Sequence, residues 1–418
     1  MKPLPHYYAA SLLAAVAGLC AGLPNLAMAL TFDQALQLAE HNAPSLNAQA
    51  AKLEAAQFAA VPAGELPDPK LLFGLQNVPF EGSNGYQLDA EPMTMQMLGV
   101  MQEMPNSAKR QARRDSAAAA IDSAAAASVV ERLQVRLQTA QAWIASYTLQ
   151  RKLTQFAAFT QQNRLFAAAV KAQLAGGAGQ AADVIGPQQE AALLAEEQDQ
   201  LRQQLQQAQA ALSRWIGDEG LQPLSGQLPQ WSINAHSDFA RQAQHPQVAA
   251  YAPLTREAEA LVRQAQAEKN SDWSWEVDYQ KRGAEYGDMF SVKFSVDLPL
   301  FSASRQTPKI AARLAEVNQL QAQQQVAVRE QEQLLRDQLA QYQRLQRAVE
   351  RSQSSLIPLA EDKLRLTEAS YAAGKTALTT VIDARRELIA NQLKQLDLQG
   401  QLALTSTWLH FNYAEQRP

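Results

Sequence analysis

Methionine recurs with a two-residue spacing in one short stretch of the sequence, and this spacing bears on metal chemistry. Side chains at every second position of a β-strand point to the same face. The stretch therefore predicts a strand with a methionine face made of Met93, Met95, Met97 and Met101. The thioether sulfur is a soft ligand that suits Cu(I) and Ag(I). The alternative is an ordinary apolar face, a role for which Leu98 and Val100 compete.

Residues for enzymatic chemistry are scattered rather than grouped. No H-x-x-x-H spacing, Ser-His-Asp set or glycine-rich phosphate loop is evident among the histidines beyond the N-terminal apolar stretch, which are His41, His236, His245 and His410. The single cysteine lies in that apolar stretch, so the remaining chain has no thiol nucleophile and no thiolate metal site. The net charge of −4 gives no support for nucleic-acid binding. We therefore expect no enzyme, no cofactor and no tight metal site.

The first 29 residues have the pattern of a secretory signal peptide. An apolar run from Tyr8 to Leu23 is followed by an A-x-A cleavage site that ends at Ala29. A membrane-anchoring helix is one alternative, and a lipid anchor on Cys20 is another, although Leu19 is not the small residue that lipid attachment needs. No later stretch reaches the about 18 apolar residues of a transmembrane helix. We expect a mature chain, 30–418, outside the cytoplasm.

Four stretches alternate between apolar and polar residues, which predicts strands with one apolar and one polar face. In the clearest one, Phe290 to Leu298, the polar positions hold Ser291, Lys293, Ser295 and Asp297. Each strand has about ten residues, the length that crosses a bilayer when tilted. A soluble sheet with one buried face is the alternative, but little other apolar material is left to cover that face. The strands are expected at about 68–80, 92–104, 271–282 and 288–300.

A four-stranded sheet cannot span a membrane alone, because its edges would leave unpaired backbone groups in lipid. We therefore expect several copies of the chain to complete a barrel. Eight strands from a dimer would be filled with side chains, whereas twelve from a trimer would leave a lumen. The apolar face would then meet lipid and the polar face would line a pore. Methionines lining such a pore would form a weak relay, because a conduit must release what it binds.

The mature chain divides into two similar halves, at about 30–225 and 226–418, as a duplication would produce. Each half reads helix, strand, strand, very long helix, turn, long helix. The match between the halves places the methionines on the polar, pore-facing side. The matched pairs are Met97 with Ser291, Gly99 with Lys293, Met101 with Ser295 and Glu103 with Asp297.

Two stretches rich in Ala, Gln, Leu and Arg predict very long helices, at about 108–174 and 304–373. At 1.5 Å per residue, roughly 65 residues make a rod on the order of 100 Å. A chain of this size cannot wrap such a rod, so we expect a coiled-coil-like bundle that includes other copies. Residues 215–231, with their glycines and prolines, are expected to cross over between the halves.

This plan resembles the TolC-type outer-membrane efflux proteins over essentially the whole mature chain. The strongest match is Tyr371-x-x-Gly374 followed by Val381-Ile382-Asp383-Ala384, similar to the family's signature at its periplasmic hairpin. The stretches PDPKLLFGLQN and QEMPNSAKRQARRD look like the heavy-metal efflux branch, although Ser107-Ala108-Lys109-Arg110 departs from the usual Gly-Lys pairing there. The resemblance implies a homotrimer in the outer membrane of a Gram-negative bacterium, with a twelve-stranded barrel and a long helical tunnel in the periplasm. It also implies docking to an inner-membrane pump of the resistance-nodulation-division type through a periplasmic adaptor, the membrane fusion protein.

The same resemblance implies functional residues at the tips of the helical hairpins. The family places an acidic ring at the closed periplasmic end, where Asp383 matches one gate aspartate, Thr380 stands in place of the other, and the repeat sets Asp183 opposite Thr380. Like charges that close repel, and the expected balancing cations are Lys375, Arg385 and Arg386. The alternative for Asp383 is a helix cap. The tip residues expected to meet the adaptor are Gly177, Tyr371, Gly374 and Lys375.

Two functions of different classes fit the sequence. The first is the exit channel of a tripartite efflux pump, which passively conducts heavy-metal cations, with Cu(I) and Ag(I) favoured. The second is a soluble periplasmic coiled-coil protein, either an adaptor or a structural spacer. An adaptor would place one small β-rich domain between two helices, without duplicated hairpins. The duplication and the four alternating strands therefore favour the channel.

Overall fold

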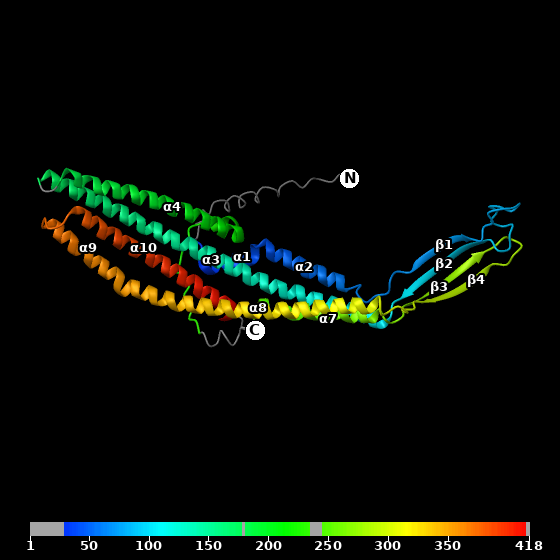
Figure 1. Ribbon diagram of the computed structural model, residues 1–418. Helices are drawn as coiled ribbons and strands as arrows, with labels where there is room; N and C mark the ends of the chain where they lie inside the picture. Colours follow the sequence, from blue (N-terminus) through cyan, green and yellow to red (C-terminus); the bar gives the residue numbers. More distant parts are fainter. Residues whose placement is uncertain (1–28, 178–179, 235–244, 415–418) are drawn as a thin grey trace, which may run out of the picture.

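The protein is long and narrow, with a small β-sheet at one end and bundled helices along the rest of its length (Figure 1). The computed structural model describes residues 29–177, 180–234 and 245–414. Residues 1–28 of the expected signal peptide, which include Cys20, and the histidine at 236 lie outside the described residues. Among the residues that are described, no helix is both long and apolar enough to cross a membrane.

The order of helix, strand, strand, long helix and long helix occurs twice along the chain (Figure 1). The boundary between the halves near residue 225 stays a prediction. The first half holds α1 (Phe32–Asn42), α2 (Pro44–Ala60), β1 (Lys70–Gln76), β2 (Met95–Met104), α3 (Ser107–Ala175) and α4 (Ile185–Ile216). The second holds α6 (Pro246–Ala249), α7 (Tyr251–Ala267), β3 (Trp273–Lys281), β4 (Met289–Val296), α8 (Gln306–Arg351), α9 (Ile357–Ala372) and α10 (Leu378–Leu409).

The four predicted strands are present and form one antiparallel sheet in the order β1-β2-β3-β4. Each lies inside its predicted range and is shorter than expected at one or both ends. β1 has only seven residues. It stops at Gln76 because Asn77 adopts a left-handed backbone with φ 54°, which turns the chain out of the ladder.

The two very long helices are also present. α3 runs for 69 residues without interruption, a rod of about 100 Å. The second continues from α8 into α9 through one π-helical turn at Ser352–Leu356. That wide turn lies directly before Pro358, whose ring and missing N–H do not fit a regular helix interior. The proline therefore loosens one turn without ending the helix.

A hydrogen-bonded junction fixes the sheet to the helices. Asn106 caps α3 by accepting a hydrogen bond from the backbone N–H of Lys109 at 2.9 Å. The backbone N–H of Asn106 donates to the carboxylate of Asp272 at 2.7 Å, and the ammonium of Lys109 donates to the same carboxylate at 2.8 Å. Asp272 immediately precedes β3, so the start of α3 in one half is tied to the start of a strand in the other.

The largest apolar core lies near the middle of the rod, where α1 and the crossover after α4 pack on α3. Its centre is the fully buried Trp143, whose ring stacks on Tyr147 with 4.9 Å between centroids and meets Phe32 edge-on at 5.4 Å. The crossover is held to α10 by the indole N–H of Trp231, which donates to the hydroxyl of Thr407 at 3.2 Å. The two hairpins, α3–α4 and α9–α10, extend from this core to the end opposite the sheet (Figure 1).

Candidate functional site: the sheet and the hairpin tips

The sheet has two chemically different faces, because the strand register keeps like positions together. Cross-strand pairs place most apolar residues of the four strands on one face, called here the apolar face, whereas Leu72 and several methionines lie on the other. It contains Leu71, Phe73, Leu75, Leu98, Val100, Trp275, Val277, Tyr279, Phe290, Val292 and Phe294. The opposite polar face contains Lys70, Gln76, Met95, Met97, Met101, Glu276, Asp278, Gln280 and Lys293.

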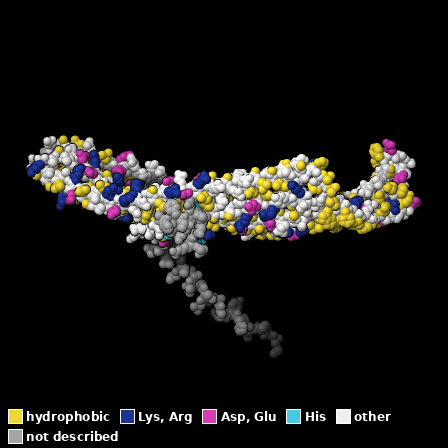
Figure 2. Space-filling model, turned by 60° about the horizontal axis from the view of Figure 1, so that its bottom comes forward, with side chains coloured by type: hydrophobic (Ala, Val, Ile, Leu, Met, Phe, Trp, Pro, Cys, Tyr) yellow, Lys and Arg dark blue, Asp and Glu magenta, His cyan; other side chains and the backbone are white. Residues whose placement is uncertain are grey.

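Exposure shows which way the sheet curves. On the apolar face, side chains splay apart: Phe73 is 81% exposed and Phe294 is 69% exposed. On the polar face they crowd together, so Asp278 is 0% and Gln280 5% exposed. The apolar face is therefore convex and the polar face concave. Figure 2 shows the resulting apolar surface at the sheet end and its junction with the helices.

An ion-pair network occupies the polar face. The ammonium of Lys293 on β4 lies 2.9 Å from a carboxylate oxygen of Glu276 and 3.0 Å from one of Asp278, both on β3. The amide of Gln280 donates to the other oxygen of Asp278 at 2.6 Å. Asp278 lies opposite Gly99 on β2, where an added Cβ would stand 2.8 Å from the Asp278 Cβ. Glycine at position 99 therefore makes room for the buried carboxylate.

Three of the four predicted methionines lie on the polar face. Met95 is buried, Met101 is partly buried, and the thioether of Met97 accepts a hydrogen bond from the Gln76 amide at 3.4 Å. The prediction that Met93 shares their strand is wrong. It lies in the turn before β2, where the Thr94 backbone N–H donates to the carbonyl of Glu91.

Sequence reasoning missed a further methionine of the polar face. Met289, the first residue of β4, pairs with Gln280 and so faces the same way as Met97, which pairs with Gln280 from the other side. Its even spacing from Lys293 was the signal that would have found it. Asp297 follows β4 and continues the ladder, because its backbone N–H donates to the carbonyl of Asp272 at 2.8 Å.

At the opposite end of the rod, each hairpin turn is closed by a glycine with a left-handed backbone. Gly374 has φ 69° and Gly177 has φ 78°. The N–H of Gly374 donates to the carbonyl of Tyr371 at 2.8 Å, and the N–H of Lys375 donates to the carbonyl of Ser370 at 2.9 Å. These two bonds form the Schellman motif that ends many helices. The Tyr371-x-x-Gly374 spacing is thus a helix stop in physical terms.

The two predicted gate aspartates have different surroundings. The carboxylate of Asp183 accepts a hydrogen bond from the backbone N–H of Gln180 at 2.9 Å and caps the short turn at Ala181–Val184. Burial raises the pKa of the Tyr371 hydroxyl, and the negative charge of Asp183 adds to this shift. Because Tyr371 and Asp183 belong to different hairpins, this interaction means that the two tips are close. Asp383 and Thr380 are exposed on the first turns of α10.

The arginines expected to balance these aspartates bind elsewhere within the chain. The guanidinium of Arg386 lies 2.5 Å from the carboxylate of Glu190, which joins α10 to α4. Arg385 lies over the ring of Phe166 with 4.5 Å to the centroid. Burial lowers the pKa of the Arg385 guanidinium, and the carboxylates of Glu368 and Glu190 oppose this shift. The prediction that either arginine pairs with an aspartate of the gate does not hold inside one chain.

The hairpins pack tightly against each other just behind the tips. Gly186 on α4 faces Ile382 on α10, and an added Cβ on the glycine would stand 2.6 Å from the Ile382 Cδ1. Ile382 belongs to an apolar cluster with Val170 and Leu378. The repeat that sets Asp183 opposite Thr380 also sets Gly186 opposite Asp383. A glycine stands at 186 because the second hairpin needs that space.

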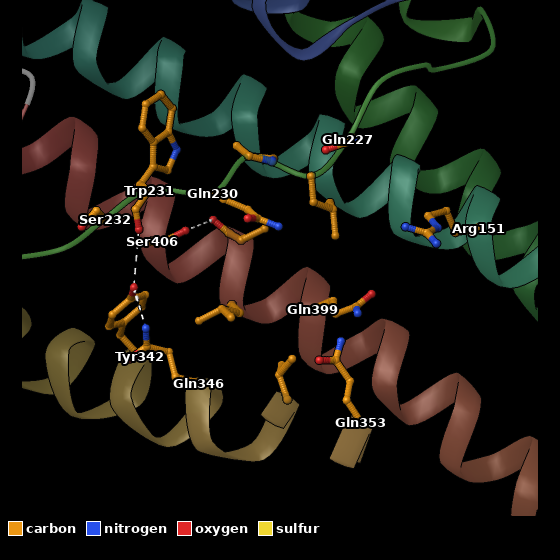
Figure 3. Close-up of a pocket in the computed structure, with 15 residues that line it drawn as sticks. Arg151, Gln227, Gln230, Trp231, Ser232, Tyr342, Gln346, Gln353, Gln399 and Ser406 are labelled. Carbon is orange, nitrogen blue, oxygen red and sulfur yellow. Dashed lines mark hydrogen bonds between the residues drawn. The ribbon is translucent and has the colours of Figure 1, made fainter. Parts of the chain in front are cut away.

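An open cavity of about 680 Å³ lies between α3, α8, α10 and the crossover segment at residues 227–232. Figure 3 shows that glutamine amides make up much of its lining, among them Gln227, Gln346, Gln353 and Gln399. The hydroxyl of Tyr342 accepts from the Gln346 amide at 2.9 Å and donates to the Trp231 carbonyl at 3.4 Å. Nothing in this lining has the grouping of an active site.

Residues 231–410 match the model of a family described as outer membrane efflux protein. A comparison with curated proteins found no match.

Solved structures share the fold over almost the whole chain. A membrane protein from Pseudomonas aeruginosa superposes with a TM-score of 0.79 at 19% identity, covering 91% of this chain and 92% of that one. VceC, an outer membrane protein from Vibrio cholerae, gives 0.76 at 20% identity, with coverages of 90% and 94%. CusC, described as forming a transmembrane channel, gives 0.72 at 16% identity, with 91% of each chain covered. The fold is therefore that of outer-membrane channel proteins, with long helices and a small β part.

Proposed function

We propose that this chain is one subunit of a homotrimeric efflux channel in the outer membrane of a Gram-negative bacterium, a passive conduit and not an enzyme. The observation that carries the proposal is the curved sheet, whose convex face is apolar and exposed while its concave face holds the buried carboxylate of Asp278 and its ion pair with Lys293. That arrangement suits a barrel wall between lipid and water. The family match at residues 231–410 and the shared fold support the same function.

The helices suit the periplasmic part of such a channel. α3 is about 100 Å long, and most of its residues are exposed or only partly buried within the chain, which leaves a large surface for contact with other chains. α2 has no buried residue at all within the chain. A soluble adaptor or spacer would leave neither a convex apolar sheet nor two long hairpins so exposed. These features favour the channel over that alternative.

We further propose that heavy-metal cations are the substrate class, with Cu(I) and Ag(I) favoured. Met95, Met97, Met101 and Met289 all lie on the polar face, which would line the pore. Thioethers bind soft monovalent cations weakly enough for release. The neighbouring carboxylates of Glu276 and Asp278 add negative charge on the same face, partly offset by Lys293.

We also propose that the hairpin tips dock a periplasmic adaptor, which links the channel to an inner-membrane pump of the resistance-nodulation-division type. Exposed apolar side chains lie on the helices that lead to the tips: Ile185 opens α4, and Leu193 and Leu366 lie about two helical turns further from the tips. Exposed apolar residues that join into a contiguous patch mark interaction sites, and packing of the two hairpins side by side would bring these residues together. Gly177, Gly374 and Lys375 form the turns at these tips, and Tyr371 packs against the apolar cluster of Val170, Leu378 and Ile382 behind them.

The metal proposal is tested by replacing methionines on one face at a time. Met97→Leu with Met101→Leu should lower Ag(I) tolerance severalfold in a host whose adaptor and pump are present and whose own channel is deleted. Met104→Leu, on the apolar face of the same strand, is the matched control and should change nothing. Tolerance of an organic pump substrate should stay unchanged in every variant. Equal Ag(I) tolerance in all variants would remove the methionines from the transport path.

A further inference from the structure

Both outer edges of the sheet lack a strand partner within the described chain. The strand order leaves β1 open on one side and β4 open on the other. Unpaired backbone groups of this kind are too costly to leave in lipid. The most exposed aromatic side chains of the sheet, Phe73 and Phe294, stand on these same two edge strands. A further strand must therefore cover each edge, and a second copy of the chain offers the complementary edge.

The internal repeat supplies the register for that pairing. Asp68 and Asp272 stand at equivalent positions before β1 and β3, just as Pro105 and Pro299 do after β2 and β4. Within the chain, β2 of the first half pairs with β3 of the second half, and Gly99 lies opposite Asp278. The repeat matches β4 to β2 and β1 to β3. The pair between copies that corresponds to β2 with β3 is therefore β4 of one copy with β1 of the next.

We propose that β4 of each copy pairs antiparallel with β1 of the next copy in the register that sets Lys293 opposite the next copy's Gly74. The inference rests on the proposed trimeric channel and specifies which residues meet in it. The same register pairs Val292 with the next copy's Leu75, Phe294 with its Phe73, and Asp297 with its Lys70.

Steric fit favours this register. Inside the chain, the bulky Asp278 fills the space over Gly99. In the proposed register, Lys293 lies opposite a glycine, Gly74 of the next copy, as Asp278 lies opposite Gly99. A Cβ added to Gly74 would have the Met97 Cε as its neighbour, at 4.0 Å. The next copy's Gly74 therefore leaves room for the Lys293 side chain. On the apolar face, two exposed phenylalanines become a cross-strand aromatic pair, which adds to sheet stability.

Charge also selects this register. The described chain gives Asp297 no ion pair, whereas Lys70 already pairs with Glu103 of its own β2. The register sets Asp297 against the next copy's Lys70, so that each ammonium would lie between two carboxylates. A slip by two residues would oppose Asp297 to Leu72 in one direction and to Asp68 in the other. A slip by one residue would turn every apolar side chain of the added strand to the pore.

Four engineered cysteine pairs distinguish these registers. Cys20 is the only cysteine of the sequence and lies in the expected signal peptide. Each pair is built in a C20S background, which removes cross-links through that thiol. The matched variants are V292C with L75C, and F294C with F73C. The offset variants are V292C with F73C, and F294C with L75C, which use the same four positions. Opposite residues have Cα atoms about 4.5–5.5 Å apart, within disulfide range, whereas diagonal ones are about 7–8 Å apart.

Each variant is extracted from outer membranes, oxidised with copper phenanthroline and run on a non-reducing denaturing gel. We expect covalent trimers from the matched variants, severalfold above any from the offset ones. Stronger cross-linking in an offset variant would overturn the register while leaving the trimer in place. No cross-link in any variant, with light scattering still giving three chains per particle, would also overturn it. Single chains by light scattering would instead refute the proposed channel.

Discussion

Charge placed on either face of β4 gives a direct test of which face meets lipid. Val292 lies in the middle of β4 on the apolar face, opposite Val277, and Ser291 beside it lies on the polar face, opposite Asp278. Arginine on the lipid face near the bilayer midplane costs about 2–4 kcal/mol. That is roughly 30- to 1000-fold in the folding equilibrium of each copy, and a trimer carries the cost three times. Arginine at 291 instead faces water and the Asp278 carboxylate.

V292R should therefore lower the trimer yield in the outer membrane and the temperature at which purified trimers dissociate, while S291R should keep both near the unmodified values. The assay is a semi-native gel of outer-membrane extracts heated in steps, with total protein measured by immunoblot. If the two variants lost trimer equally, the assignment of faces would be wrong. If S291R were the more damaging, the sheet would be inverted relative to this account.

Three further predictions concern the helical part. His245 is buried, and its Nε2 nitrogen donates to Asn412 at 2.8 Å while Nδ1 accepts from a backbone N–H. Burial lowers the pKa of His245, and the hydrogen bond to Asn412 opposes this shift. The unfolded chain therefore binds a proton more readily than the folded one. The contribution of His245 to folding stability is complete above about pH 6.5 and declines as the pH falls below that value. The melting temperature of the unmodified protein should drop from pH 7.5 to 5.5, and this drop should be smaller in H245Q and unchanged in H41Q. Equal drops in all three proteins would show that His245 is not the cause. G374A should cost about 1 kcal/mol, because alanine is strained at φ 69°; chemical denaturation measures it, and an unchanged midpoint would contradict the turn geometry. D183A with D383A should raise the concentration of a trivalent cation needed to block conductance in planar bilayers, and unchanged block would leave both aspartates as ordinary helix-end carboxylates.

The parts of the fold that follow local rules could be predicted from the sequence. The alternation around Phe294 identified a strand and its two faces, and Tyr371-x-x-Gly374 marked the end of a long helix. Prolines and glycines placed the turns. Met93 was misplaced because alternation continues by chance into the turn before β2, where the bonds of Thr94 end the ladder.

Contacts between distant segments could not be predicted from one sequence. Arg386 binds Glu190, a residue 196 positions away on the other hairpin, and nothing local to either residue marks the pair. The space that Gly186 leaves for Ile382 is a packing requirement of the same kind. Met289 was missed although it lies in the predicted strand, because a single methionine at the end of a strand forms no repeating pattern on its own. The repeat carried long-range information, because it aligned the faces of strands that lie in different halves.

The central claim is that this chain forms a trimeric channel in the outer membrane. The most direct measurement is multi-angle light scattering of protein extracted by detergent from the outer-membrane fraction. We expect particles with three chains, which require detergent to stay in solution. A monomer that remains soluble in the periplasmic fraction without detergent would contradict the account, because the open strand edges and the apolar convex face would then be exposed to water.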